Sequence, residues 1–238
     1  IYMSYIKKIK ISDSLGISST GNIALDKNII YTCNKDGLQK KIHKFNVNGT
    51  YIDFIKTDIP ISTFTYDNLT KKFYTHYSNN YSKNTLIHIL DNKGTLIETI
   101  DYSSIIPSEI LYKENQPWNI ESLTLDSQKN YLLFSLENSN NIYTISLNKN
   151  FINVFNFKTN DLLINKFGHT LSIDSDSSLW ITYVNKDNDI KLANISTNGI
   201  IQQTFDTNFK ITDVNIGGII IDHENFSNKC VLWLSCTH

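Results

Sequence analysis

Five short hydrophobic segments, each ending in an aspartate, divide this chain of 238 residues into units of similar length. The segments end at Asp26, Asp67, Asp126, Asp174 and Asp222, with spacings of 41, 59, 48 and 48 residues. A period of this size, with several strands in each unit, is typical of repeat architectures in which every unit is one four-stranded sheet. This recurrence constrains the fold more than any other feature of the sequence.

The pattern continues beyond each aspartate. A polar turn leads to a second apolar segment, in which a Ser or Thr follows two large side chains. Aligned on that Ser or Thr, the five segments are Ile30-Tyr31-Thr32, Phe73-Tyr74-Thr75, Leu133-Phe134-Ser135, Trp180-Ile181-Thr182 and Trp233-Leu234-Ser235. Four hairpins with period-two alternation then begin at Ile42, Leu86, Ile142 and Ile190. We therefore expect four antiparallel strands per unit and no long helix.

These units predict an all-β fold, a five-bladed β-propeller with four-stranded antiparallel blades. The single domain spans 1–238, and the expected blades cover about 17–57, 60–101, 118–158, 166–207 and 214–238, the last one completed by about 4–12. SYIKKIKISDSL, residues 4–15, matches the outermost strands of other units, so we expect the N-terminal strand to close the ring and remove its exposed edges. One strand of that blade is unaccounted for, so the blade either has three strands or lacks a segment.

The segments DSDSSLWIT (174–182) and ESLTLDSQKNYLLFSLEN (121–138) carry a resemblance to known propellers. They resemble blades of the NHL, streptogramin-lyase and SMP-30-like propellers, whose turns follow the pattern D-x-x-G-x-L-W-[IV]-[ST]. Ser177 stands where such turns usually have Gly. The resemblance covers all five units and implies how a blade is built, not an activity.

Charge and hydropathy exclude several function classes. All 22 basic side chains are Lys, the chain has no Arg, and its net charge is −1. Nucleic-acid binding and the arginine cluster of sialidases are therefore not expected. The longest apolar run has only a few residues, so membrane insertion is not expected either. No signal-peptide pattern is visible, and the sequence does not fix the compartment; an extracellular or virion-surface location is the version we favour.

One position in the repeat changes character between units. Five residues before each aspartate the chain has Gly21, Ser62, Glu121, His169 and Gly217. This position opens the innermost strand, which in propellers starts at the mouth of the central channel. The candidate ligand-binding residues expected at that mouth are Trp118, Asn119, Lys166, Asp213, Asn215, Glu137, Asn185, Tyr77 and Tyr81. We expect the insertion at 101–117 on the same face, because binding residues concentrate on loops.

Two function classes fit these residues. The first is a binding module for a glycan, a peptide or a protein surface, without a cofactor or a metal site. The second is a hydrolase or lyase in which Glu121 and His169 act as general acid and base, or hold a divalent cation such as Ca²⁺ or Mg²⁺ with Asp213 and Asn215. We favour the binding module over an enzyme, because only one carboxylate occupies an inner-strand start. A purely structural role in an assembly is a third alternative.

Overall fold

The fold is seen in a computed structural model, in which most of the chain consists of β-strands. The structure describes residues 20–34, 39–78, 84–111, 119–137, 139–157, 162–196, 199–212, 215–222 and 231–237.

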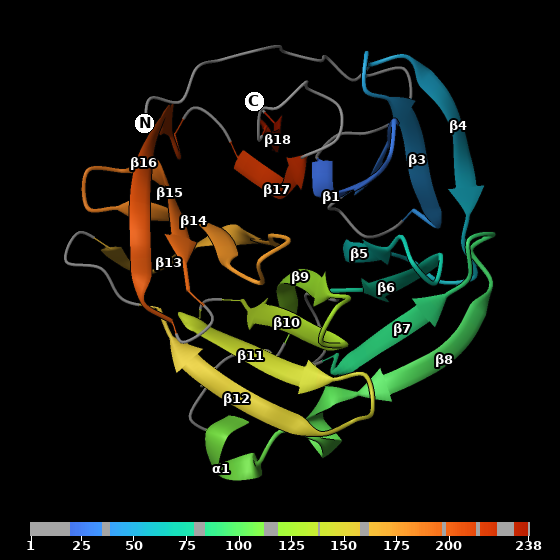
Figure 1. Ribbon diagram of the computed structural model, residues 1–238, viewed down its shortest axis with the longest axis horizontal. Helices are drawn as coiled ribbons and strands as arrows, with labels where there is room; N and C mark the ends of the chain where they lie inside the picture. Colours follow the sequence, from blue (N-terminus) through green and yellow to red (C-terminus); the bar gives the residue numbers. More distant parts are fainter. Residues whose placement is uncertain are drawn as a thin grey trace.

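Four sheets of four antiparallel strands form the blades (Figure 1). The first contains β1 (Thr20–Asp26), β2 (Ile29–Asn34), β3 (Lys41–Asn46) and β4 (Tyr51–Lys56). The second contains β5 (Thr63–Asp67), β6 (Lys72–His76), β7 (Leu86–Leu90) and β8 (Leu96–Asp101). The third contains β9 (Ile120–Asp126), β10 (Tyr131–Leu136), β11 (Asn141–Ser146) and β12 (Phe151–Asn156), and the fourth β13 (Leu162–Ile173), β14 (Leu179–Asn185), β15 (Asp189–Ile195) and β16 (Ile201–Lys210). The predicted antiparallel four-stranded blade is thus confirmed.

The fifth unit is smaller than predicted. It forms a two-stranded sheet of β17 (Asn215–Asp222) and β18 (Val231–Thr237). Its inner strand β17 lies between β13 and β1, so the inner strands follow one another around the axis as β1, β5, β9, β13 and β17 (Figure 1). The structure therefore shows four complete blades, not five, because only two strands of the fifth unit belong to the described chain. The predicted closure by residues 4–12 lies outside the described residues.

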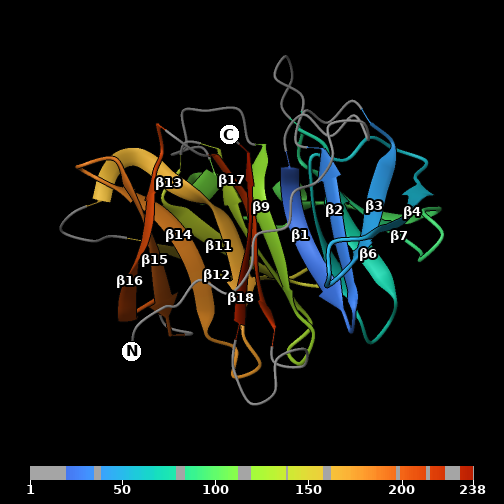
Figure 2. The ribbon, with the colours of Figure 1, turned by 90° about the horizontal axis from the view of Figure 1, so that it is seen from above.

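The strands run between two faces of the ring (Figure 2). We call the face where the inner strands begin the mouth face, and the face with the turns after Asp26, Asp67, Asp126 and Asp174 the aspartate face. As expected for turn caps, Asp67 and Asp126 accept hydrogen bonds from the backbone N–H of Leu69 and Gln128, at 3.0 and 3.1 Å. Ser177 has a φ of 65°, a left-handed conformation that Gly adopts more readily than other residues.

The core fills the spaces between blades. The described part of the insertion at 101–117 contributes to this core and contains the 3₁₀ turn η2 (Tyr102–Ser104) and the short helix α1 (Ser108–Leu111). The expected position of the insertion on the binding face stays a prediction. Tyr102, Ile106 and Leu111 are buried against the facing strands of the second and third blades. This part of the insertion therefore packs between two blades through its large apolar side chains.

Candidate functional site

Several predicted site residues fall where no side-chain geometry is described. Trp118, Tyr81 and Asp213 lie outside the described residues. Lys166, His169 and Asn215 belong to strands β13 and β17, but their side chains are not described. Glu121 lies in β9 and is half-buried, and the strand that carries His169, β13, is the inner-strand neighbour of β9. The roles assigned to these six residues and Glu121 remain predictions.

The structure does bring together Glu137, Asn119 and the segment that follows β6. The Ser78 hydroxyl donates a hydrogen bond to Glu137 Oε1 at 2.9 Å, and the Asn119 side-chain amide donates to Glu137 Oε2 at 3.3 Å. The Glu137 N–H also donates to the Asn119 carbonyl at 2.9 Å. Since Ser78 belongs to the second unit and Asn119 and Glu137 to the third, this carboxylate links two blades.

Tyr77 adjoins the same link. The Asn84 side-chain amide donates to the Tyr77 carbonyl at 2.6 Å, and Asn84 Oδ1 accepts from the Leu86 N–H at 3.1 Å. The Tyr77 ring itself is half-buried. Asn84 therefore fixes the backbone that presents Tyr77 at the mouth face.

His76, which the sequence analysis passed over, is the most constrained titratable group here. It is fully buried; its Nδ1 lies 2.9 Å from the Leu86 carbonyl, and its Nε2 lies 3.1 Å from the Ile120 backbone nitrogen. Nε2 must accept from that N–H, so Nδ1 carries the proton and donates to Leu86. Burial lowers the pKa of His76 to about 4. A neutral imidazole with both nitrogens bonded holds blades together and is not poised to accept a substrate proton.

The sequence did contain a signal for His76. In the first unit, Cys33 follows the repeated Thr32, and in the second unit His76 follows Thr75 at the same place. An imidazole that replaces a small apolar group on a buried strand needs hydrogen-bond partners. Those partners come from the start of β7 in the same blade and from the next blade, which no local pattern reveals.

Asn22 crosses the axis of the ring. Its side-chain amide donates to the Phe64 carbonyl at 2.8 Å and to the Leu123 carbonyl at 3.0 Å, which joins β1 to β5 and to β9. On the other side of Asn22, a Cβ added to Gly218 would lie 2.8 Å from Asn22 Oδ1, so β17 approaches as closely as a glycine allows. A ligand entering along the axis from the mouth face would therefore stop at Asn22.

Asn185 is engaged in its own turn. Its Oδ1 accepts from the N–H groups of Asp187 and Asp189 at 3.0 and 2.8 Å, and its Nδ2 donates to Asp189 Oδ2 at 3.2 Å. The side chain is buried. The sequence Asn-Lys-Asp-Asn-Asp carried this signal, because an Asn that starts a tight turn between two strands commonly caps it. Both polar ends of Asn185 thus shape the loop.

Among the side chains that the structure describes, no group of three or more His, Cys, Asp or Glu residues is placed to hold a metal ion. Within the described residues, no helix is long and apolar enough to cross a membrane.

Comparison with known proteins adds a structural reference for the fold. No family model matches the chain, and no curated protein matches it. The chain is similar to a solved structure described as "Crystal structure of WD40 beta propeller domain of Doa1", at 11% sequence identity and a TM-score of 0.48, over 90% of this chain and 59% of that one. The resemblance to NHL, streptogramin-lyase and SMP-30-like blades is not confirmed by a family match. The arrangement of the sheets themselves shows an all-β propeller with four-stranded antiparallel blades.

Proposed function

We propose that this propeller is an interaction module, which binds a partner at its surface and performs no chemistry on it. The observation that carries this proposal is the use of the polar groups near the mouth face: Glu137 and His76 are bonded across blades, and Asn119 donates to Glu137. A general acid or base must lie within hydrogen-bond reach of the substrate atom that it protonates or deprotonates. Groups bonded in this way instead give the rigid framework that a binding surface requires.

The mouth face is the surface that we favour for a ligand. Tyr77 is half-buried there, and the sequence adds Trp118 and Tyr81 in neighbouring segments. Aromatic rings stack on the apolar faces of sugars, and amide side chains pair with their hydroxyl groups. A glycan is therefore the ligand class that we favour for this face, with a peptide or a protein surface as the alternatives.

A propeller enzyme is the second candidate. It would use Glu121 and His169, with or without a divalent cation such as Ca²⁺ or Mg²⁺. The observation in its favour is that these residues lie on β9 and β13, which are neighbouring inner strands. Both residues belong to the same repeated position, so a shared ligand between the two blades is a specific expectation.

Glycan and peptide arrays probed with three variants separate these candidates. For a binding module, Trp118→Ala should weaken retention by about 1–3 kcal/mol through lost stacking, and Glu121→Gln should change it little. Phe54→Ala, which removes a partly exposed ring from outer strand β4, is the control and should bind like the parent. Metal-dependent hydrolysis or elimination that Glu121→Gln reduces by a factor on the order of 10² would replace the proposal with the enzyme.

A further inference from the structure

One position on the second strand of each unit carries a large ring in every unit but one. In the pairing of the first and second strands, this position lies opposite the residue that stands two places before the repeated aspartate. The five residues at this position are Tyr31, Tyr74, Leu133, Trp180 and Trp233. The third blade alone has an aliphatic side chain there, so this blade departs from the repeat on the side that faces the fourth blade.

Between the first and second blades, the ring at this position belongs to a compact aromatic cluster. The Tyr31 ring centroid lies 5.1 Å from that of Tyr66 and 5.4 Å from that of Phe73. At the end of the cluster nearest the aspartate face, the Tyr66 hydroxyl donates to Asp26 Oδ2 at 3.3 Å, and Lys71 Nζ donates to the same oxygen at 2.8 Å. Three rings and a bonded carboxylate thus fill this interface.

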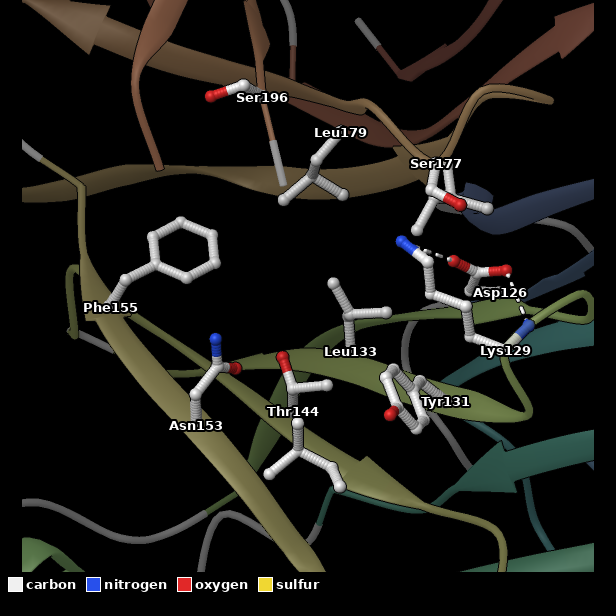
Figure 3. Close-up of a pocket in the computed structure, with 12 residues that line it drawn as sticks. Asp126, Lys129, Tyr131, Leu133, Thr144, Asn153, Phe155, Ser177, Leu179 and Ser196 are labelled. Atoms are coloured by element: carbon white, nitrogen blue, oxygen red, sulfur yellow. Dashed lines mark hydrogen bonds and ion pairs between the residues drawn. The ribbon is translucent and has the colours of Figure 1, made fainter. Parts of the chain in front are cut away.

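Between the third and fourth blades, the equivalent residues are smaller. Leu133, Ile173 and Leu179 take the places of Tyr31, Tyr66 and Phe73. They line a cavity of about 90 Å³, several times the roughly 10–15 Å³ that one water molecule needs. In Figure 3, Leu133 and Leu179 extend from facing blades toward this space, with Phe155 on one side of it.

The carboxylate at the end of this cavity nearest the aspartate face also differs from the equivalent carboxylate of the first interface. Asp126 is the equivalent of Asp26 and is buried. Its Oδ1 accepts from the turn N–H groups of Gln128 and Lys129, whereas its Oδ2 lies 3.7 Å from Lys129 Nζ, beyond hydrogen-bond distance (Figure 3). In the described part of the chain no tyrosine hydroxyl reaches it, in contrast to Tyr66 at Asp26. Compared with the first interface, this one therefore lacks the ring at the repeated position and the tyrosine hydroxyl that donates to the carboxylate.

The outer wall of the cavity is formed by β12, which is the outermost strand of its sheet. Its sequence, FINVFN, contains no charged residue. The other outermost strands each carry two, as expected for exposed sheet edges: Asp53 and Lys56, Glu98 and Asp101, and Asp206 and Lys210. Ile152 of β12 lines the cavity and is 39% exposed. An uncharged border favours an uncharged partner, because a charge placed there would lose water without gaining a counter-ion.

We propose that this space, the blade 3–4 groove, binds an extended and uncharged segment of a partner protein that inserts a tyrosine. Its ring lies between Leu133 and Leu179, and its hydroxyl donates to Asp126 beside Lys129. A neutral phenol suits that end of the groove, since a carboxylate would face Asp126 and an ammonium would face Lys129. Aromatic side chains in apolar pockets commonly dominate the energetics of such interfaces. The inference deepens the proposed interaction function and rests on it, but it uses a surface that the mouth face does not share.

A peptide-display library of random sequences provides the test, with selection on the parent chain after depletion on Leu133→Tyr. This variant restores the repeated ring and fills the groove, and the other units show that the fold accommodates a ring at this position. Selected peptides should share a tyrosine flanked by uncharged residues. Their synthetic copies should bind the parent at least 10-fold more tightly than Leu133→Tyr, and exchanging the peptide tyrosine for phenylalanine should weaken binding about 5-fold. Enrichment of no such peptide would overturn the proposal.

A pair of charge variants on β12 checks the groove without altering its floor. Asn153→Lys places an ammonium on the groove side, where Asn153 is exposed and lines the cavity. Asn156→Lys, at an exposed position outside the cavity lining, is the matched control. We expect the first variant to weaken the selected peptides at least 5-fold and the second to leave them unchanged. Equal effects of the two variants would contradict a site in the groove.

The failure of this inference is distinguishable from failure of the proposed function. Suppose that the parent retains array ligands and Trp118→Ala loses them, while no peptide discriminates the parent from Leu133→Tyr. The interaction function then stands and the groove proposal is wrong. Binding of p-cresol, observed through the methyl NMR signals of Ile152 and Leu179, without any binding of tyrosine peptides would also refute it, because the groove would then take a small phenol.

Discussion

His76 makes the stability of this propeller depend on pH in a calculable way. The imidazole is neutral in the fold because burial lowers its pKa to about 4, with the nearby His88 acting in the same direction. In the unfolded chain its pKa is about 6.5. Between these two values the unfolded chain binds a proton that the folded chain does not bind. The free energy of unfolding therefore falls as pH decreases from 6.5 to 4.

The size of this effect follows from the same two pKa values. A shift of roughly 2.5 units at about 1.4 kcal/mol per unit corresponds to a loss on the order of 3 kcal/mol at pH 4. This is a large share of the roughly 5–15 kcal/mol that stabilises a typical domain. The structural reason is specific: a proton on Nε2 would remove the acceptor for the Ile120 N–H and place two donors opposite each other.

Urea unfolding of the parent and of His76→Gln between pH 7 and pH 4 measures this contribution. Glutamine does not titrate, so the variant is expected to be less stable at pH 7 and to lose about 3 kcal/mol less than the parent on acidification. His88→Gln is the control, because His88 is only half-buried and its Nδ1 contacts the Thr99 hydroxyl. Parallel stability curves for the parent and His76→Gln would refute the argument.

Four further predictions concern the stability of the ring. Asn22→Leu should lower the free energy of unfolding by about 2–4 kcal/mol in urea titrations, because the Phe64 and Leu123 carbonyls lose their donor. Lys149→Gly should raise the melting temperature by a few degrees, since Lys149 has a φ of 63° at a turn position that is Gly in the other complete blades. Gly94→Ala should lower the melting temperature, because the new Cβ would lie 2.1 Å from the Lys56 carbonyl oxygen. Deletion of residues 1–12 should cost several kcal/mol if they close the last blade; a truncated chain that melts within about two degrees of the parent would contradict that closure.

The repeat made most of the fold predictable because its signals are local. Strand alternation, the aspartate turns and the hairpin turns each depend on a few adjacent residues, and all recur. The size of the fifth unit was not predictable in this way. Its strands β17 and β18 carry the same pattern as the other units, and the further strand expected from residues 4–12 lies outside the described residues.

The candidate site was harder to predict than the fold, because its polar residues are bonded over long distances. The Ser78 hydroxyl reaches Glu137 across 59 positions in the sequence, and the His76 imidazole reaches the Ile120 N–H across 44. From sequence alone, Glu137 and Asn119 were equally suited to bind a ligand or to join blades. The local turn signal of Asn185 was the exception, since the backbone N–H groups that donate to its Oδ1 lie only two and four residues away.

Register explains why the blade 3–4 groove was not visible in the sequence. Alignment of the second strands on their Ser or Thr places Phe134 at the position of Tyr31, so every unit then shows a large side chain and no departure. Strand pairing instead matches Tyr31 with Leu133, because these residues lie opposite Ala24 and Thr124, each two positions before its aspartate. The Phe134 ring points to the other face of the sheet and is buried against Tyr102. A shift of one residue exchanges the two faces of a strand, so the missing ring could be recognised only after the pairing had been fixed by the structure.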